Sequence, residues 1–333
     1  MAYKELQYDR QEAVLKSHPE LFEHDKGYGV FQGEKRSFAV ENGLHNLFEP
    51  IRSKAIQYFK ENKISWWKGD DNEGVKGPTT HMLSSQIACL NHLFAIKDDA
   101  DVVLSLVNHL RPGVSFSRVI PIDLDKDPAG YIAFEVVSKG RWLNERTRTR
   151  GSQCTSVDAL IIGEKDNGER WLIPIEWKYT EVYNLNDDKS QEDRDNEPKG
   201  SNGRGLTRLK NYSDLITESS YLQTVSPYIH SIYFFEPFYQ LMRQTLWAEQ
   251  MIKHRDEEWV RADKFLHIHI IPAENKDLLD MAYLKTGKGM EESWRSQLLQ
   301  DIYQIINPEA LLSPLKGNSK YSDLINYLTI RYW

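Results

Sequence analysis

The feature that most constrains the fold of this chain is a pair of strand-like segments with charged residues at corresponding places. The segments VDALIIG at 157–163 and WLIPIEWKYTE at 171–181 are joined by the polar, glycine-containing stretch EKDNGER. Apolar runs of this length on either side of such a turn predict a β-hairpin. Because successive side chains alternate across a strand, Glu176 and Lys178 are expected on one face and Trp177 on the other.

The carboxylates of this hairpin predict a metal site. Asp158 lies at the start of the first segment, so pairing of the two segments brings it toward Glu176 and Lys178. Buried carboxylates repel one another unless a cation or a proton compensates them, and hard oxygen ligands suit Mg²⁺, for which Mn²⁺ can substitute. We expect Asp158 and Glu176 to hold the ion and Lys178 to act beside the attacking water or the scissile phosphate. The alternative is a simple ion pair between Glu176 and Lys178 on a solvated strand.

The spacing of these residues resembles the core signature of the PD-(D/E)XK nuclease superfamily. Asp158 is followed by 17 residues and then by Glu176-x-Lys178, while Val157 replaces the proline that gives the signature its name. The resemblance covers 82–237 and implies an α/β fold of the restriction-endonuclease-like type, in which helices flank a central mixed β-sheet. It also implies a Mg²⁺-dependent nuclease with Asp158, Glu176 and Lys178 as its catalytic residues.

We therefore expect hydrolysis of a phosphodiester bond of DNA, with the backbone carbonyl of Trp177 as a further metal ligand and Lys178 stabilising the charge that develops in the transition state. The alternative, from another class, is a nucleic-acid-binding or protein-interaction module that keeps this fold without turnover, because a fold does not fix a function. Pro174 is unusual in a central strand and predicts a bulge or an edge position. A homodimer would provide the two sites that cutting both strands requires, but no interface stripe is visible in the sequence.

Nucleases of this superfamily often take a third acid from the first helix or from an adjoining strand. Glu135, within the predicted strand at 131–137, is the main candidate, and a glutamate at a solvated strand edge is the equal alternative. Glu145 and Glu41 are weaker candidates. Gln86, on the predicted helix beneath the site, could replace an acid as a neutral oxygen ligand or contact substrate, although a glutamine on a helix is usually a surface residue.

A run of arginines precedes the hairpin. Arg146, Arg148 and Arg150 alternate with threonine in ERTRTRG, so an extended segment presents three guanidinium groups along one side. This arrangement suits a phosphate backbone. The alternative is an edge strand whose charges discourage pairing with other chains.

A second set of substrate contacts is expected on the helix GLTRLKNYSDLI that follows the hairpin. Arg204, Arg208 and Tyr212 are spaced four apart on one face of it. Related exonucleases carry a Gln-x-x-x-Tyr pair on the corresponding helix, and here Arg208 and Tyr212 have the spacing without the glutamine. Between hairpin and helix, the polar stretch at 184–203 predicts a mobile loop, either a lid or an ordinary insertion.

Apolar periodicity predicts the remaining elements. We expect residues 1–80 to form an N-terminal helical elaboration, 81–275 the nuclease-like core and 276–333 a C-terminal helical elaboration, all in one compact unit. His267 and His269 share a strand face and could share a metal, but a packed strand is favoured because no third ligand lies nearby. The predicted helices lie at 38–60 (with a kink or break at Pro50), 82–96, 101–110, 204–216, 238–253, 276–284, 290–306 and 321–332, and further strands at 116–122, 229–235 and 265–272.

Composition limits the kind of partner and the setting. The 333 residues carry a formal net charge of -7, which argues against binding of nucleic acid mainly by bulk positive charge but not against a site built from carboxylates. Only Cys89 and Cys154 are cysteines, and no charged start leads into an apolar run. We therefore expect a cytoplasmic protein without a disulfide framework, a zinc site or a membrane span.

Overall fold

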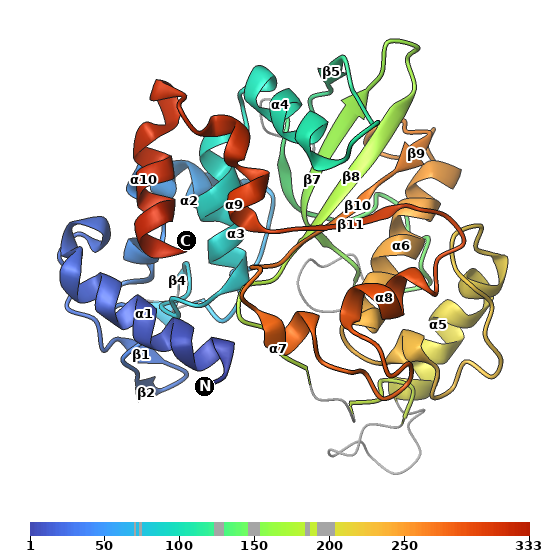
Figure 1. The fold of residues 1–333 in the computed structure, drawn as a ribbon, viewed down its shortest axis with the longest axis horizontal. Coiled ribbons are helices and arrows are strands. Elements are labelled where there is room, and N and C mark those ends of the chain that lie inside the picture. The colour runs from blue at the N-terminus through green and yellow to red at the C-terminus, as the bar shows by residue number, and fades with distance from the viewer. Residues whose placement is uncertain (70, 73–74, 123–129, 146–153, 184–186, 192–203) are drawn as a thin grey trace.

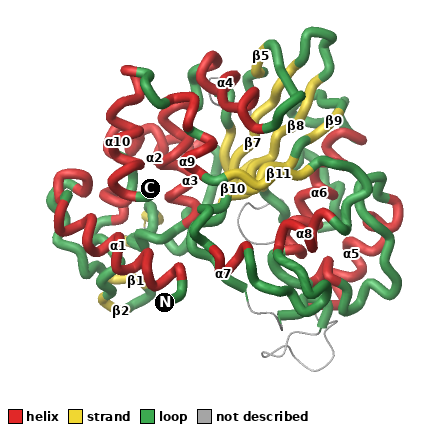
Figure 2. The backbone as a smooth tube through the Cα atoms, in the orientation of Figure 1, coloured by secondary structure: helices red, strands yellow, loops and turns green. Residues whose placement is uncertain are grey.

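A mixed β-sheet lies at the centre of the molecule (Figures 1 and 2). The computed structural model describes residues 1–69, 71–72, 75–122, 130–145, 154–183, 187–191 and 204–333. Within this part of the chain the sheet has seven strands in the order β11-β10-β8-β7-β5, with β6 also paired to β7 and β9 to β8. The strands are β5 (Arg118–Val119), β6 (Ala133–Val136), β7 (Val157–Glu164), β8 (Arg170–Trp177), β9 (Lys264–Phe265), β10 (His267–Ile270) and β11 (Tyr303–Ile306).

The predicted hairpin and the predicted α/β class are both confirmed. β7 and β8 are antiparallel, and β10 runs parallel to β8 on one side and to β11 on the other. Pro174 pairs with Leu160 of β7, and on its other side it faces the interruption between β9 and β10. A proline nitrogen cannot donate to a strand ladder, so this break places the missing donor where no ladder bond is required.

Helices cover both faces of the sheet (Figure 1). On one face, Ile175 and Trp177 of β8 belong to a core that joins the N-terminal and C-terminal segments; on the other face, Leu160 and Leu172 belong to a second core. The first face carries α1 (Tyr3–Ser17), α2 (Arg52–Glu61), α3 (Ser85–Leu93), α4 (Ala100–Leu110), α9 (Pro308–Leu311) and α10 (Ser322–Arg331), and the second α5 (Arg204–Glu218), α6 (Phe238–Lys253), α7 (Lys276–Leu279) and α8 (Met290–Arg295).

Short elements complete the description. Two small hairpins pair β1 (Val30–Phe31) with β2 (Glu34–Lys35) and β3 (Asp71–Asn72) with β4 (Val75–Lys76). No helix in the described residues is long and apolar enough to cross a membrane. The 3₁₀ turns are Pro19–Phe22, Gly43–Asn46, Glu49–Ile51, Phe94–Ile96, Ile232–Phe234, Ser313–Leu315 and Ser319–Tyr321.

Four secondary-structure predictions were wrong. The helix predicted at 276–284 ends at Leu279. The helix predicted at 38–60 is reduced to α2, because Pro50 lies in a 3₁₀ turn that leads into it. The strand predicted at 229–235 is a 3₁₀ turn at Ile232–Phe234. The helix predicted at 290–306 ends at Arg295, and its last four residues form β11 instead, parallel to β10.

Candidate active site

The candidate site lies where β7 and β8 separate. Their pairing runs from Glu164 and Arg170 to Ala159 and Ile175, and one step further along this register would bring Asp158 opposite Glu176. That step is not part of the ladder. Instead, the Trp177 N–H donates to the carboxylate of Asp158 at 2.7 Å.

Glu135 extends this row of carboxylates onto a third strand. β6 pairs Phe134 with Ala159 and Val136 with Val157, so Glu135 lies opposite Asp158. Its φ of 50° is in the left-handed region, which an ordinary side chain adopts at a cost. The Glu135 carboxylate accepts hydrogen bonds from Gln86 at 2.8 Å and from Ser156 at 3.3 Å. Glu135 and Gln86 line a small cavity together with Asp158 on the α3 side of the sheet.

Ionisation of Asp158 is unfavourable in this place. Burial raises the pKa of its carboxyl well above the usual range, and the negative charges of Glu176 and Glu135 raise it further. The positive charge of Lys178 and the Trp177 N–H oppose this rise only in part. A site of this kind has an excess of negative charge that a cation would relieve.

Lys178 is held as a cation. Burial disfavours its charged form, but Glu176, foremost among the neighbouring negative groups, raises the pKa of Lys178 well above its ordinary value. The two side chains lie on one face of β8, as alternation predicts, and are 2.6 Å apart. The surroundings of Lys178 therefore favour its charged form.

Two glutamines of α6 hold this ion pair, and sequence reasoning missed both. Gln240 donates to Glu176 at 2.6 Å and accepts from Lys178 at 2.6 Å. Gln244 donates to the other oxygen of Glu176 and to the backbone oxygen of Ser156. Their spacing of one helical turn was the available signal: two amides on the apolar face of a predicted helix require buried partners.

The described carboxylates do not surround a single metal position. Among the described residues, no three His, Cys, Asp or Glu side chains are close enough together to hold a metal ion. Asp158 and Glu135 share the cavity beside α3, whereas both oxygens of Glu176 bind side chains of α6 or Lys178. The donor set nevertheless consists of hard oxygens, which fits Mg²⁺.

The predicted contacts on α5 are only partly at the surface. Tyr212 is buried, and its hydroxyl donates to Glu145 at 2.8 Å. Glu145 also accepts from the backbone N–H and the hydroxyl of Thr155, at 2.6 Å each, so it braces the start of β7. Arg208 donates to the backbone oxygen of Lys189 at 3.2 Å, and Arg204 is exposed at the first turn of α5.

The remaining site residues predicted from the sequence either lie away from the site or fall outside the described residues. Arg146, Arg148 and Arg150 are outside the described residues. Most of the loop predicted at 184–203 is outside them too, but Asp188 is anchored by its ion pair with His230 at 2.5 Å. Glu41 is exposed in the N-terminal part, where its N–H donates to Asp25.

His267 and His269 form a packed strand, as favoured from sequence. Both are buried in β10, and His269 pairs in register with Glu176. Burial lowers the pKa of His267 to about 3. The two histidines therefore stay neutral beneath the Glu176 side of the sheet.

Comparison with known proteins agrees with this geometry. The family described as "Restriction Endonuclease associating with ARP" matches residues 8–333. The chain belongs to this restriction endonuclease family. Neither the curated proteins nor the solved structures include a match. Family membership implies a nuclease that acts on DNA, and the matched range extends from α1 to the last residue, so the helices outside the 82–237 region are part of the family's pattern.

Proposed function

We propose that this protein is a Mg²⁺-dependent nuclease that hydrolyses phosphodiester bonds of DNA at the Asp158–Glu176–Lys178 site. The observation that carries the proposal is the row of Glu135, Asp158 and Glu176 across three adjacent strands, at the point where β7 and β8 part. Acids in a row that is partly buried raise the free energy of the folded chain unless a cation or a proton compensates their charges. Family membership supplies the reaction class.

The donor set suggests how the ion would be bound. Asp158 and Glu176 would hold it, with Glu135 and the backbone carbonyl of Trp177 as further ligands. A bound Mg²⁺ would supply Lewis-acid stabilisation of phosphate charge and a more acidic water. Mn²⁺ has the same ligand preference and would substitute.

The protein's own groups perform the remaining work. The surroundings of Lys178 favour its charged form, so it would orient water and stabilise the charge that develops on the non-bridging oxygens of the phosphate. Gln240 would keep the Lys178 ammonium and the Glu176 carboxylate in place, because it binds both. Arg204 and Arg208 would contact the DNA backbone, together with Arg146, Arg148 and Arg150; Tyr212 and Gln86 would support this surface from within.

The decisive experiment is cleavage of linear duplex DNA with Mg²⁺ by the full chain and its variants. Asp158→Asn and Glu176→Gln should each lower the rate by about 10²-fold or more while DNA binding is kept. Lys178→Ala should behave in the same way. Glu164→Gln is the matched control, because Glu164 lies at the other end of β7 and pairs with Arg118 and Arg170. Equal rates for Asp158→Asn and Glu164→Gln would contradict the assignment.

A second measurement separates metal binding from catalysis. Millimolar Mn²⁺ should raise the melting temperature of the wild-type chain, and Asp158→Asn should remove this shift. No shift in the wild type, with DNA binding retained and cleavage absent, would instead indicate a nucleic-acid-binding module with the same fold.

The arginines are tested by salt dependence. Replacing Arg204 or Arg208 with alanine should lower the log–log salt slope of DNA binding by roughly one unit for each phosphate that the arginine neutralises. The same holds for Arg146, Arg148 and Arg150. If the salt slope of DNA binding were unchanged in all five variants, none of these arginines would contact the phosphates of DNA.

Assembly is a separate part of the proposal. Cutting both strands of a duplex requires two sites, which a homodimer would provide, and sedimentation of the chain with and without DNA would measure this. The family description names association with ARP. We extend that association to this chain, and a pull-down with the tagged full chain that does not retain ARP would contradict it.

A further inference from the structure

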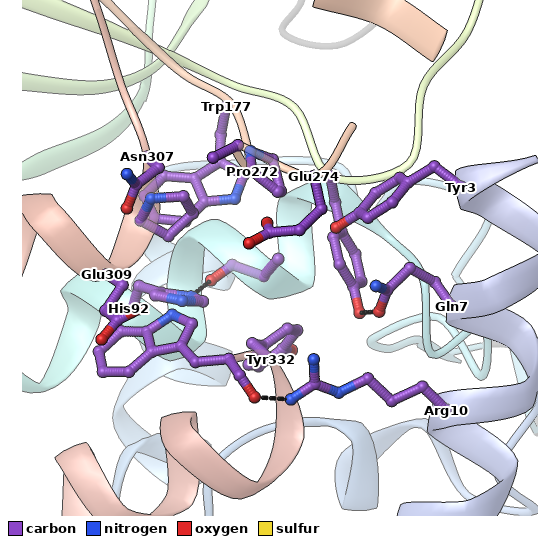
Figure 3. A pocket seen from close by; sticks show the side chains of 15 residues that line it. Tyr3, Gln7, Arg10, His92, Trp177, Pro272, Glu274, Asn307, Glu309 and Tyr332 are labelled. Carbon is purple, nitrogen blue, oxygen red and sulfur yellow. Dashed lines mark hydrogen bonds between the residues drawn. The ribbon is translucent and has the colours of Figure 1, made fainter. Parts of the chain in front are cut away.

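Two cavities adjoin the sheet on the side of α3, and the smaller of them reaches the row of acids. The larger, of about 170 Å³, lies between α1, α3, the end of β8 and the last residues of the chain (Figure 3). None of Glu135, Asp158 and Glu176 is among the described residues that line it. The smaller cavity has Glu135, Asp158 and Gln86 in its wall, and both acids are half-buried. A ligand of these acids would therefore approach past Gln86.

Two successive tryptophans lie beside the smaller cavity and differ in burial. Trp66 is buried, and its ring stacks at 3.8 Å on Phe59, which lines the cavity. Trp67 has 45% of its surface exposed. Its backbone N–H donates to Gln86 at 2.9 Å, and the amide of the same Gln86 donates to Glu135 at 2.8 Å. One side chain therefore connects an exposed tryptophan with the row of acids.

The indole of Trp67 packs against two other rings. The ring centroid of Phe31, in the β1–β2 hairpin, lies 6.1 Å from that of Trp67, and the ring of His81 meets it edge-on at 5.9 Å. Aromatic pairs at such separations attract one another. The indole is thus positioned by the fold although nearly half of the residue is exposed, so a ligand that stacks on it orders little that is not already ordered.

Lysines accompany the exposed ring. The Nζ of Lys68 is 5.2 Å from the ring centroid of Trp67 and 5.7 Å from that of Phe31. Lys63, a few residues earlier, is exposed, and neither lysine forms an ion pair among the described residues. An ammonium group on a flexible stem can follow a phosphate backbone. An exposed aromatic ring beside such cations is the combination that binds single-stranded nucleic acid, in which the ring takes a base and the cations take phosphates.

The charge of the chain favours a contact that does not depend on phosphate. With a formal net charge of -7, bulk attraction to DNA is weak. Stacking of one base on an aromatic ring increases affinity about tenfold, and every base has a face that can stack. In a continuous duplex each base face is covered by its neighbours, so only an unstacked base can lie on the ring.

We propose that Trp67 stacks on an unpaired base of the DNA substrate, near the phosphate that is cleaved, and that Lys68 contacts the backbone beside that base. The inference rests on the proposed nuclease function and makes it more specific, because the preferred substrate then carries unpaired nucleotides, as in a bubble or a single-stranded end. Gln86 alone spans the gap from Trp67 to Glu135, and a stacked strand rises by about 3.4 Å per nucleotide. The base therefore belongs to one of the nucleotides nearest the cut.

Binding is measured by fluorescence anisotropy of labelled DNA, with Ca²⁺ in place of Mg²⁺ and the DNA recovered intact afterwards. The probes are a fully paired duplex and the same duplex with a short unpaired bubble. Trp67→Ala should weaken binding of the bubble about tenfold and of the paired duplex less than about twofold. The salt slope should not change, because a neutral ring releases no counterions. Lys68→Ala should instead lower the slope by roughly one unit.

Trp171 and Lys165 provide the matched controls. Trp171 is half-buried near the start of β8, at the end of the strand away from Glu176, and the Nζ of Lys165 lies 4.5 Å from its ring centroid. Trp171→Ala and Lys165→Ala should leave both the affinity for the bubble and the salt slope unchanged. Melting temperatures show whether each variant folds, and Trp67→Phe, which keeps an aromatic ring and should retain part of the affinity, keeps the test informative if Trp67→Ala does not fold.

Stacking itself is followed with 2-aminopurine at successive positions of the bubble, because its fluorescence falls when the base stacks. The wild type should quench at least one position, and Trp67→Ala should not. Equal affinities of the wild type and Trp67→Ala for the bubble, or equal losses for bubble and duplex, would overturn the proposal while cleavage by the Asp158 site stands. A wild type that binds neither DNA would overturn the nuclease assignment as well. If Trp67→Ala kept DNA binding but no longer retained ARP in a pull-down, the ring would be a protein contact and the proposal would be wrong.

Discussion

Two buried cations of this protein, Arg331 and Lys178, are surrounded in opposite ways. Arg331 is fully buried and binds neutral acceptors: Gln11 at 3.1 Å, the backbone oxygen of Asn46 at 2.7 Å and the hydroxyl of Tyr327 at 2.5 Å. Lys178 binds a carboxylate, Glu176, beside a second acid whose ionisation is already unfavourable. Arg331 therefore closes a network, whereas Lys178 belongs to one that still carries excess charge.

The difference is the one expected if the Arg331 cluster serves the fold and the Lys178 cluster the proposed chemistry. Aromatic rings enclose Arg331, with Phe22 and Tyr332 within 5.1 Å and 4.9 Å of its guanidinium carbon. Such a group is satisfied by neutral dipoles and needs nothing from solvent or ligand. The Lys178 cluster, by contrast, has the unsatisfied oxygen of Gln244 and the unsatisfied Nε2 of His269 near it, among the described residues. Strained, incompletely paired groups are typical of functional sites.

The largest expected effect is on the closed cluster. Arg331→Met should lower the free energy of unfolding by about 3–5 kcal/mol, because it leaves the buried acceptors of Asn46, Gln11 and Tyr327 without a donor. Denaturant unfolding measures this. Arg295→Met, on the exposed side of α8, is the control and should change stability by less than about 1 kcal/mol. If Arg331→Met left the free energy of unfolding unchanged, the Arg331 network would not be a source of stability for the fold.

Asp25 is the centre of a second satisfied cluster, in which the buried charge is negative. Its carboxylate accepts from the N–H groups of Gly27 and Glu41, at 2.8 Å each, and of Asn42 at 3.1 Å, and it contacts His45 at 2.8 Å. Burial raises the pKa of Asp25, but these hydrogen bonds outweigh it and lower the pKa below the ordinary 3.8.

A folded-state pKa below the unfolded one gives stability that is present above pH 3.8 and is lost as pH falls through the folded-state value. Asp25→Ala should therefore cost about 2–3 kcal/mol near neutral pH and progressively less in acid. Chemical unfolding at a series of pH values tests this. A cost that is the same at every pH would show that the charge of Asp25 is not what binds these N–H groups.

Substitution of Gln240 tests whether cleavage needs this amide to position Lys178 and Glu176. Gln240→Leu should slow DNA cleavage by about tenfold or more and leave KM for DNA unchanged, because Lys178 and Glu176 lose their shared partner without any change in the DNA surface. Gln250→Leu, at a buried glutamine nearly three turns further along α6, is the matched control. If Gln240→Glu keeps Lys178 and Glu176 in place but does not restore the rate of cleavage, the neutral charge of the amide is required as well as its position. If Gln240→Leu and Gln250→Leu gave equal rates, the amide would be structural only.

The smallest expected effect is a gain in the free energy of unfolding. In the absence of divalent ions, Asp158→Asn should raise the free energy of unfolding by about 1 kcal/mol, since asparagine keeps an acceptor for the Trp177 N–H and removes a charge repelled by Glu176 and Glu135. Thermal and chemical unfolding with chelator present would measure it. If Asp158→Asn lowered the free energy of unfolding instead, the Asp158 carboxylate would stabilise the fold, as the Arg331 and Asp25 clusters do.

The sequence was most informative where a local signal decides the structure. The hairpin around Asp158 and Glu176 follows from alternation and turn chemistry, and α3 begins where Ser84 accepts a hydrogen bond from the backbone of Ile87. The sequence was least informative for β11, because a four-residue strand after a short helix has the same apolar content as a longer helix. Only its parallel pairing with β10 distinguishes the two.

The candidate site divides in the same way. Asp158, Glu176 and Lys178 are predicted as the site from their spacing and their place on a hairpin, but the contact of Gln240 depends on α6 folding back over β8 from 62 residues away. Glu135 could be named from its strand, yet not its left-handed backbone or its place opposite Asp158. Local patterns therefore predict the candidate reactive groups, and tertiary packing decides which side chains hold them.

The pairing of the first helix with the last has a consequence for synthesis of the chain. Gln11 and Arg331 meet although they are 320 residues apart in sequence. As the polypeptide leaves the ribosome, α1 and α3 must wait for α10, and the apolar face that they share stays exposed until translation is almost complete. Contacts of such separation form late and leave partly folded chains prone to association. We therefore expect nascent chains stopped before residue 322 to remain bound by chaperones, and ribosome-stalled chains of increasing length would show where release begins.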